Sequence, residues 1–110
     1  MPLTTSSDIE RVVKIVLLDE AHRRLEAEDD WWREHRDAQD VFIDELSETL
    51  EKLQVAPEVG QKYRLARGKL VQRVLMKKTR CHVYYIVDRD RGVLEIQTIW
   101  GAVRGRGPKL

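Results

Sequence analysis

The alternation of apolar and polar residues is strongest in the second half of the chain. Three runs rich in Val, Ile, Leu, Tyr and Thr have the composition of half-buried strands: Leu70 to Met76, Cys81 to Val87 and Val93 to Trp100. The polar breaks between them, 77–80 and 88–92, have the length of hairpin connections. The pattern predicts a three-stranded antiparallel meander, followed by a tail rich in glycine and arginine.

Successive side chains of a strand point to opposite faces, so each run divides into two sets. In the second run one set is apolar and is expected to face the helices: Cys81, Val83, Tyr85 and Val87. Arg73, His82 and Tyr84 are then expected to line the other, uncovered face. Alternation in the third run groups Leu94, Ile96, Thr98 and Trp100 on one face.

The first half of the chain has helical periodicity. Residues 11–18 are mostly apolar and rich in β-branched side chains, and they predict a buried or edge strand that pairs with the meander. A helix that runs through from Ser7 is the alternative, because residues 7–10 resemble a capping box. A helix is expected from Asp19 to about His35, because Ala21, Leu25 and Trp32 fall on one stripe. A second helix, with Asp37 as its N-cap, is expected to extend to about Leu53. Its stripe is formed by Phe42, Leu46, Leu50 and Leu53.

The order of elements is therefore strand, helix, helix, strand, strand, strand. The short link between the helices predicts an antiparallel helical hairpin, and Pro57 and Gly60 end its second helix. Residues 61–68 are interpreted as a basic connection into the sheet. The predicted fold is α+β, with the hairpin packed on one face of a small antiparallel sheet. Residues 1–10 are expected to be a loose tail, and 11–110 a single domain.

Charge is distributed unevenly between the two halves. Residues 1–57 contain 7 Lys and Arg against 15 Asp and Glu, whereas residues 58–110 contain 13 against 4. The net charges are therefore −8 and +9, although the whole chain has a net charge of only +1. This asymmetry suggests a basic working face, which favours acidic proteins or nucleic acid as partners. The alternative is that acidic helices cover a basic sheet and both are ordinary solvated surface.

Several classes of function are not supported by the sequence. No phosphate loop, zinc-protease motif or cysteine–histidine cluster is present, so no metal or cofactor is expected. No apolar run is long enough for a membrane span, and no signal peptide is recognisable. The single cysteine, Cys81, is expected to be a small buried hydrophobe, and its isolation indicates a reducing cytoplasm.

Two groups of residues have candidate chemistry. Arg73, His82 and Tyr84, joined by Arg104 and Arg106 from the tail, could bind phosphates and transfer protons during RNA cleavage. The alternative is an ordinary solvated sheet face. In the aromatic pair 31–32, Trp32 continues the core stripe, whereas Trp31 points elsewhere and could anchor a partner.

The chain resembles the RelE/ParE superfamily of toxins from bacterial type II toxin–antitoxin systems, also labelled plasmid stabilisation proteins. The likeness spans roughly residues 13–108 and is carried by the order and spacing of several short segments: Ala21, Trp31-Trp32, 50–53, 56–60, 73–75, 79–88, and 99–100 leading to 104–108. It implies a growth inhibitor that forms a hetero-oligomer with a cognate antitoxin. An acidic, partly disordered antitoxin segment would suit the basic half of the chain.

The resemblance implies two possible targets. RelE-like members cleave mRNA on the ribosome with basic sheet residues and an acid–base Tyr or His near the C-terminus. ParE-like members instead poison DNA gyrase. Only Gly, Arg, Pro, Lys and Leu follow Arg104, so a terminal proton donor is missing and the ParE-like branch is favoured. A basic binding module without toxicity is a further alternative.

The resemblance to these toxins implies residues for binding the target and the antitoxin. The proposed target-binding residues are Trp100, Arg104 and Arg106. The proposed antitoxin-binding residues are Trp31, Arg73, Lys77, Lys78 and Arg80. In the nuclease alternative, Arg73 and Arg104 would clamp phosphates, and His82 or Tyr84 would be the acid–base group.

Overall fold

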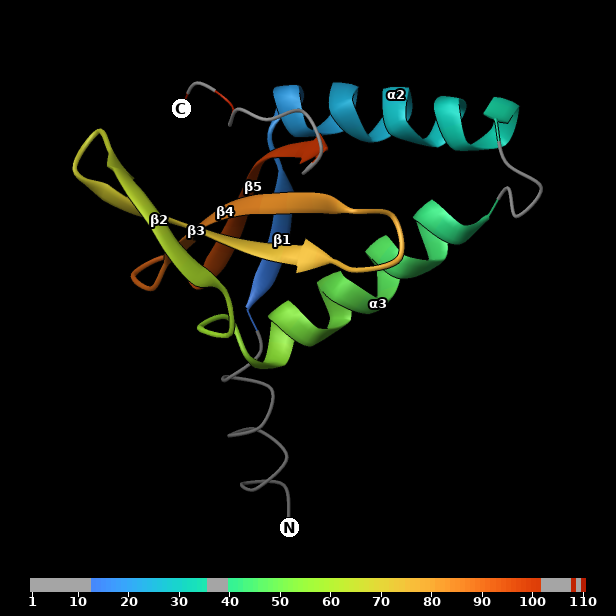
Figure 1. Cartoon of the computed structure of the whole chain (residues 1–110). Helices are drawn as coiled ribbons and strands as arrows, with labels where there is room; N and C mark the ends of the chain where they lie inside the picture. Colours follow the sequence, from blue (N-terminus) through green and yellow to red (C-terminus); the bar gives the residue numbers. More distant parts are fainter. Residues whose placement is uncertain (1–12, 36–39, 102–107, 109) are drawn as a thin grey trace, which may run out of the picture.

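The computed structural model describes residues 13–35, 40–101, 108 and 110. Within them the chain forms a five-stranded sheet and two helices (Figure 1). The elements in chain order are β1 (Lys14–Leu17), α2 (Asp19–His35), α3 (Val41–Val55), β2 (Gln61–Ala66), β3 (Lys69–Met76), β4 (Cys81–Asp88) and β5 (Val93–Gly101). The predicted α+β architecture and the three-stranded meander are confirmed.

The sheet has the strand order β1-β5-β4-β3-β2. Its β2 to β5 portion is antiparallel, but β1 pairs with β5 in parallel, as shown by the partners Lys14 and Val93. The predicted pairing of the first strand with the meander is confirmed, but its direction makes the sheet mixed, where an antiparallel sheet was predicted. A parallel pair needs a long crossover connection, which the chain between β1 and β5 supplies.

Strand β2 is the second correction. The segment 61–68 was interpreted as a connection, but Gln61–Ala66 forms an edge strand that pairs with β3. Its side chains are mostly exposed, and Leu65 has 71% of its surface exposed. Because an edge strand with little cover needs no apolar face, its sequence lacks the alternation by which the other strands were recognised.

Both helices pack on one face of the sheet. Figure 1 shows the chain reversing between α2 and α3, which spread apart from their common end. Helix α3 begins at Val41 with Asp40 in the N-cap position. The predicted N-cap, Asp37, lies outside the described residues and three positions before the observed one.

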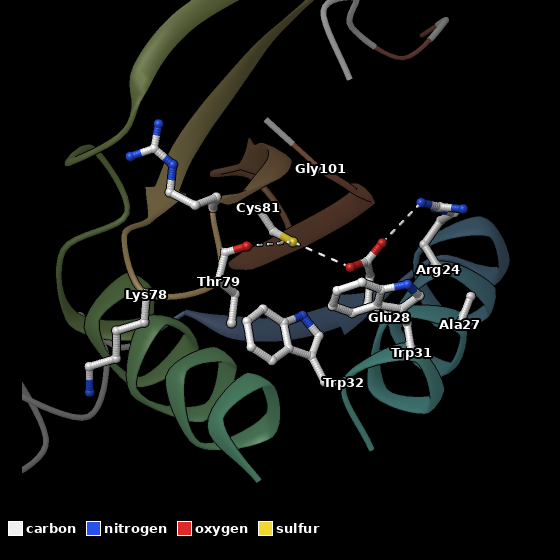
Figure 2. Close-up of a pocket in the computed structure, with 10 residues that line it drawn as sticks. Arg24, Ala27, Glu28, Trp31, Trp32, Lys78, Thr79, Cys81 and Gly101 are labelled. Atoms are coloured by element: carbon white, nitrogen blue, oxygen red, sulfur yellow. Dashed lines mark hydrogen bonds and ion pairs between the residues drawn. The ribbon is translucent and has the colours of Figure 1, made fainter. Parts of the chain in front are cut away.

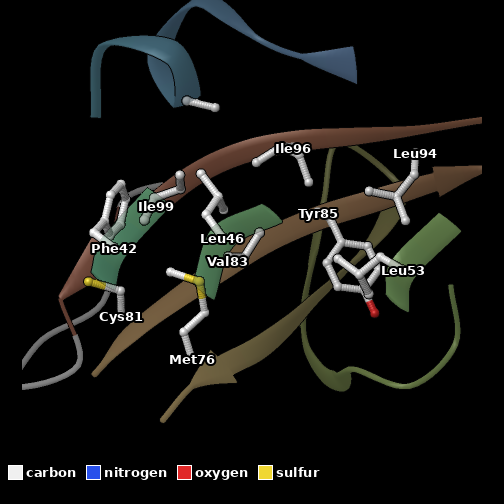
Figure 3. Close-up of a cluster of buried hydrophobic side chains, with 11 residues drawn as sticks. Phe42, Leu46, Leu53, Met76, Cys81, Val83, Tyr85, Leu94, Ile96 and Ile99 are labelled. Atoms are coloured by element: carbon white, nitrogen blue, oxygen red, sulfur yellow. The ribbon is translucent and has the colours of Figure 1, made fainter. Parts of the chain in front are cut away.

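The main core lies between the helices and this face of the sheet (Figure 3). Phe42, Leu46 and Leu53 of α3 are buried against it, as the helical stripe predicts. The buried members of the core on the strands are Met76, Cys81, Val83, Tyr85, Leu94, Ile96 and Ile99. Cys81, 1% exposed, is thus the small buried residue expected from the sequence.

A bulge changes the alternation predicted for β5. Tyr84 pairs with Thr98, and the next residue, Tyr85, pairs with Ile96, which leaves Gln97 as the additional residue. Leu94 and Ile96 therefore share the helix-covered core with Ile99, while Thr98 is paired opposite Tyr84. The predicted grouping of Leu94 and Ile96 with Thr98 and Trp100 was wrong, because period-two counting fails across a bulge.

Candidate functional site

The face of the sheet away from the helices holds a cluster of Arg73, Tyr84 and Tyr63. Arg73 and Tyr84 are cross-strand partners on β3 and β4, and Arg73 Nη1 donates to the Tyr84 hydroxyl at 3.4 Å. The Arg73 guanidinium also lies 5.0 Å from the ring centroid of Tyr63 on β2. The two tyrosine rings meet edge to face at 4.8 Å. Strand β2, missed in the sequence, thus supplies the aromatic ring that holds Arg73 in place.

His82 lies beside this cluster. Its ring centroid is 5.8 Å from that of Tyr84, and its strand partner on β5 is Trp100. Partial burial and, to a lesser degree, the positive charge of Arg73 lower the pKa of His82 below its ordinary value of 6.5. The structure therefore brings the predicted residues Arg73, His82 and Tyr84 together and favours a neutral imidazole among them.

The face is not the uncovered surface that was expected. Tyr84 has only 1% of its surface exposed and belongs to a second apolar cluster with Val71 and Ile86. Tyr63, Ala66, Trp100 and Leu110 pack against this cluster. Alternation along a strand indicates which residues share a face, but it does not indicate whether other side chains cover that face. The Tyr84 hydroxyl is consequently a buried partner of Arg73.

Trp100 is linked to the helical side of the molecule by Arg24 of α2. The Arg24 guanidinium lies 5.3 Å from the Trp100 ring centroid, and its Nε donates to the carbonyl oxygen of Ile99 at 3.2 Å. Arg24 Nη2 also bonds Glu28 at 3.3 Å, and both side chains are largely buried. The sequence did not single out Arg24, because it lies among other charged residues with the same local pattern, such as Arg23.

The turn between β3 and β4 is held by a buried carboxylate. Glu45 of α3, 8% exposed, accepts hydrogen bonds from the backbone amides of Lys78 and Thr79 at 2.8 and 2.9 Å and from the Thr79 hydroxyl at 2.8 Å. The side chains of Lys77, Lys78 and Arg80 remain exposed. Glu45 was not singled out from the sequence. The available signal is that this carboxylate lies three residues after Phe42 on the apolar stripe of the helix, where a charged group needs hydrogen-bond partners.

Between this turn and α2 lies a pocket of about 360 Å³ (Figure 2). Trp31 is 42% exposed and meets Trp32 edge to face at 5.6 Å. Trp31 also stacks on His35 at 4.6 Å. The residues that line the pocket are Arg24, Ala27, Glu28, Trp31, Trp32, Lys78, Thr79, Arg80, Cys81 and Gly101.

The structure divides the residues predicted to bind the antitoxin. Trp31, Lys78 and Arg80 line the pocket, and Lys77 is an exposed residue of the same turn. Arg73 lies apart from them, in the cluster with Tyr84. Of the residues predicted to bind the target, Trp100 packs against the second apolar cluster, while Arg104 and Arg106 lie outside the described residues.

Two further observations concern all of the described residues. Among the described residues, no group of His, Cys, Asp and Glu side chains is arranged to hold a metal ion. No described helix has the length and apolar character needed to cross a membrane.

Comparison with solved structures identifies the fold family to which this architecture belongs. A chain of the chromosomal ParDE toxin–antitoxin system from P. aeruginosa superposes with a TM-score of 0.65 and 15% identity, covering 83% of this chain and 97% of that chain. The chain has the RelE/ParE fold. The isolated RelE toxin of E. coli gives a TM-score of 0.58 at 12% identity and covers 86% of this chain and 88% of its own.

The RelE/ParE fold extends to an archaeal complex. A chain of the RelE–RelB complex from Pyrococcus horikoshii OT3 gives a TM-score of 0.60 at 14% identity, covering 86% of this chain and 99% of that chain. No family model and no curated protein matches the sequence. With identities this low, the likeness is one of architecture, and function has to be argued from the site.

Proposed function

We propose that the protein is the toxin of a type II toxin–antitoxin pair, which inhibits growth by binding DNA gyrase and is neutralised by a cognate antitoxin. The shared RelE/ParE fold, present in the ParDE system and in the RelE–RelB complex, supports the toxin and antitoxin parts of this proposal. The basic second half of the chain supports an acidic partner segment.

The burial of Tyr84 is the observation that favours binding over RNA cleavage. A proton-transfer group has to come within hydrogen-bond distance of the reacting oxygen. The Tyr84 hydroxyl is buried and bonded to Arg73, whose guanidinium is itself packed on Tyr63. The sequence after Arg104 contains neither Tyr nor His to take its place. With the Tyr84 hydroxyl buried and no Tyr or His after Arg104, His82 is the remaining candidate for proton transfer, and inhibition by binding to the target is the favoured mechanism.

Controlled expression in bacteria tests the toxin role. Induction of the intact chain is expected to arrest growth, and Arg104→Ala is expected to abolish the arrest, because the tail arginine is proposed to contact the target. Arg89→Ala is the control, since this exposed arginine pairs with Glu58 on the surface. Harmless expression of the intact chain would instead support a basic binding module without toxicity.

An mRNA endonuclease is the second candidate, and His82 is the observation that favours it. Its lowered pKa keeps the imidazole neutral, which is the form that accepts a proton, and Arg73 is close enough to influence it. Under this alternative His82→Ala removes mRNA cleavage in a translation extract. Under the gyrase proposal the same variant arrests growth like the intact protein.

A further inference from the structure

The pocket between α2 and the β3–β4 turn combines an apolar interior with a basic margin. Figure 2 shows the indoles of Trp31 and Trp32 side by side, with Cys81 and Thr79 on the opposite wall. Trp31 lines the pocket and is a large aromatic residue with 42% of its surface exposed. Indole rings that are already held by their neighbours lose little conformational entropy on binding, which suits them to anchor a partner.

The acidic residue inside the pocket is already neutralised. Glu28 Oε2 accepts a hydrogen bond from Arg24 Nη2 at 3.3 Å, and Cys81 Sγ donates to Glu28 Oε1 at 3.6 Å. Burial, with Glu28 next in importance, raises the pKa of Cys81 to about 12, so its thiol remains uncharged. Among the described residues that line it, the interior of the pocket is therefore close to neutral and suits an apolar side chain.

The margin of the pocket is positively charged, and the backbone that carries it is bonded to α3. Among the described carboxylates, none forms an ion pair with Lys77, Lys78 or Arg80. Glu45 binds the backbone of this turn and leaves the three basic side chains exposed. Because the backbone of the turn is already fixed, pairing with carboxylates orders only the basic side chains and not the loop that carries them.

We infer that this pocket docks an acidic segment of the antitoxin, with one aliphatic or aromatic side chain between Trp31 and Cys81 and carboxylates at Lys78 and Arg80. The inference rests on the proposed function for the identity of the partner. The basic margin selects an anionic partner, which the proposed function identifies as an acidic segment of the antitoxin, and the neutral interior selects an apolar anchor. Arg24 bonds the pocket residue Glu28 and packs on Trp100, so the docked segment adjoins the proposed target-binding end of β5.

Peptide binding to the intact protein tests the inference. The probes are fluorescein-labelled peptides of equal length: one of Glu and Asp around a central Leu, one with Gly in place of that Leu, and one with Lys in place of the acids. The acidic peptide with Leu is expected to bind at least about tenfold more tightly than either of the others, as measured by fluorescence anisotropy. A single-stranded RNA oligonucleotide serves as a fourth probe.

Variants locate the binding. Trp31→Ala is expected to lower the affinity for the acidic Leu peptide by about 10- to 30-fold, the usual effect of removing an interface anchor. Lys78→Glu combined with Arg80→Asn is expected to weaken it by about tenfold or more. Asn is chosen at position 80 because Arg80 has φ of 62°, a conformation that Asn tolerates. The matched control is Lys62→Glu on the exposed edge strand β2, which is expected to bind like the wild type.

Four results would overturn the inference. The first two are no binding by any peptide up to about 1 mM and equal affinity for the acidic and lysine peptides. The other two are wild-type affinity of a folded Trp31→Ala protein and Trp31-dependent binding of RNA in preference to the acidic peptide. Circular dichroism and thermal unfolding confirm that each variant is folded. Because the binding assay requires no growth arrest, failure of the docking site and failure of the toxin role are separate results.

Discussion

The backbone amide of Gly60 donates a hydrogen bond to the side-chain hydroxyl of Tyr85 at 2.9 Å. The same hydroxyl donates to the carbonyl oxygen of Pro57 at 2.9 Å, so one tyrosine fixes the loop between α3 and β2 to the central strand β4. A Cβ atom on Gly60 would lie 2.8 Å from the carbonyl oxygen of Arg73 and 2.9 Å from the ring of Tyr85. This position needs glycine because the loop passes close to the backbone of β3 and to the Tyr85 side chain.

Gly60→Ala is therefore expected to lower the free energy of unfolding by about 1–3 kcal/mol, the usual effect of overpacking. Urea unfolding of the purified protein measures it. Val59→Ala is the matched control, because Val59 is the next residue and is 50% exposed; its effect is expected to stay within about 0.5 kcal/mol. A Gly60→Ala protein as stable as the control would show that the loop moves away without cost.

Glu45 is expected to make a large contribution to stability through the β3–β4 turn. Glu45→Ala leaves two backbone amides and the Thr79 hydroxyl without their acceptor, which is expected to cost about 2–4 kcal/mol. Glu45→Gln retains one acceptor oxygen and is expected to cost less. The exposed Glu48 of the same helix provides the control variant Glu48→Ala. Equal unfolding midpoints for Glu45→Ala and Glu48→Ala would contradict the assigned role of the carboxylate.

The thiol of Cys81 is expected to be unreactive in the folded protein. It is 1% exposed, and burial together with Glu28 raises its pKa to about 12, so almost no thiolate is present near neutral pH. A colorimetric disulfide reagent at about pH 8 is expected to leave the native protein unmodified and to label it fully in denaturant. Rapid labelling of the native protein, with no change in its circular dichroism, would show that the pocket wall is open.

His82 is expected to make the protein less stable in mild acid. Its pKa is lowered in the folded state by burial and by Arg73 and returns to its ordinary value of 6.5 in the unfolded chain. As the pH falls below about 6.5, the unfolded chain takes up this proton first, so the free energy of unfolding decreases.

The comparison of wild-type protein with His82→Gln isolates this contribution, because the other histidines are common to both proteins. Between about pH 7 and pH 5 the wild type is expected to lose more stability than the variant. Parallel stability–pH curves for the two proteins would mean that His82 titrates alike in the folded and unfolded states.

The sequence predicts those helices and strands that have one face buried in the core and the other face exposed to water. Ala21, Leu25 and Trp32 marked a helix whose predicted limits, Asp19 to about His35, agree with α2. The apolar stripe of α3 and the set Cys81, Val83, Tyr85 were assigned to the core, and all of the buried members are found there. The period of apolar residues along the chain reflects which side chains are buried, so it identifies the helices and strands that contribute to a core.

The remainder could not be predicted because it depends on neighbours distant in sequence. Strand β2 is an exposed edge and has no apolar period. The bulge at Gln97 is visible only in the pairing with β4. Tyr84 is buried because Tyr63, Trp100 and Leu110 pack around its cluster, and no local pattern near Tyr84 indicates that cover.

Inhibition of purified DNA gyrase tests the central claim most directly. The intact protein, added to gyrase and relaxed plasmid, is expected to block supercoiling in proportion to its concentration, and a parallel translation extract is expected to keep its mRNA whole. Two results together would contradict the proposal and establish the nuclease alternative. Supercoiling would be unimpaired, and mRNA in the extract would be cut by the intact protein but not by the His82→Ala variant.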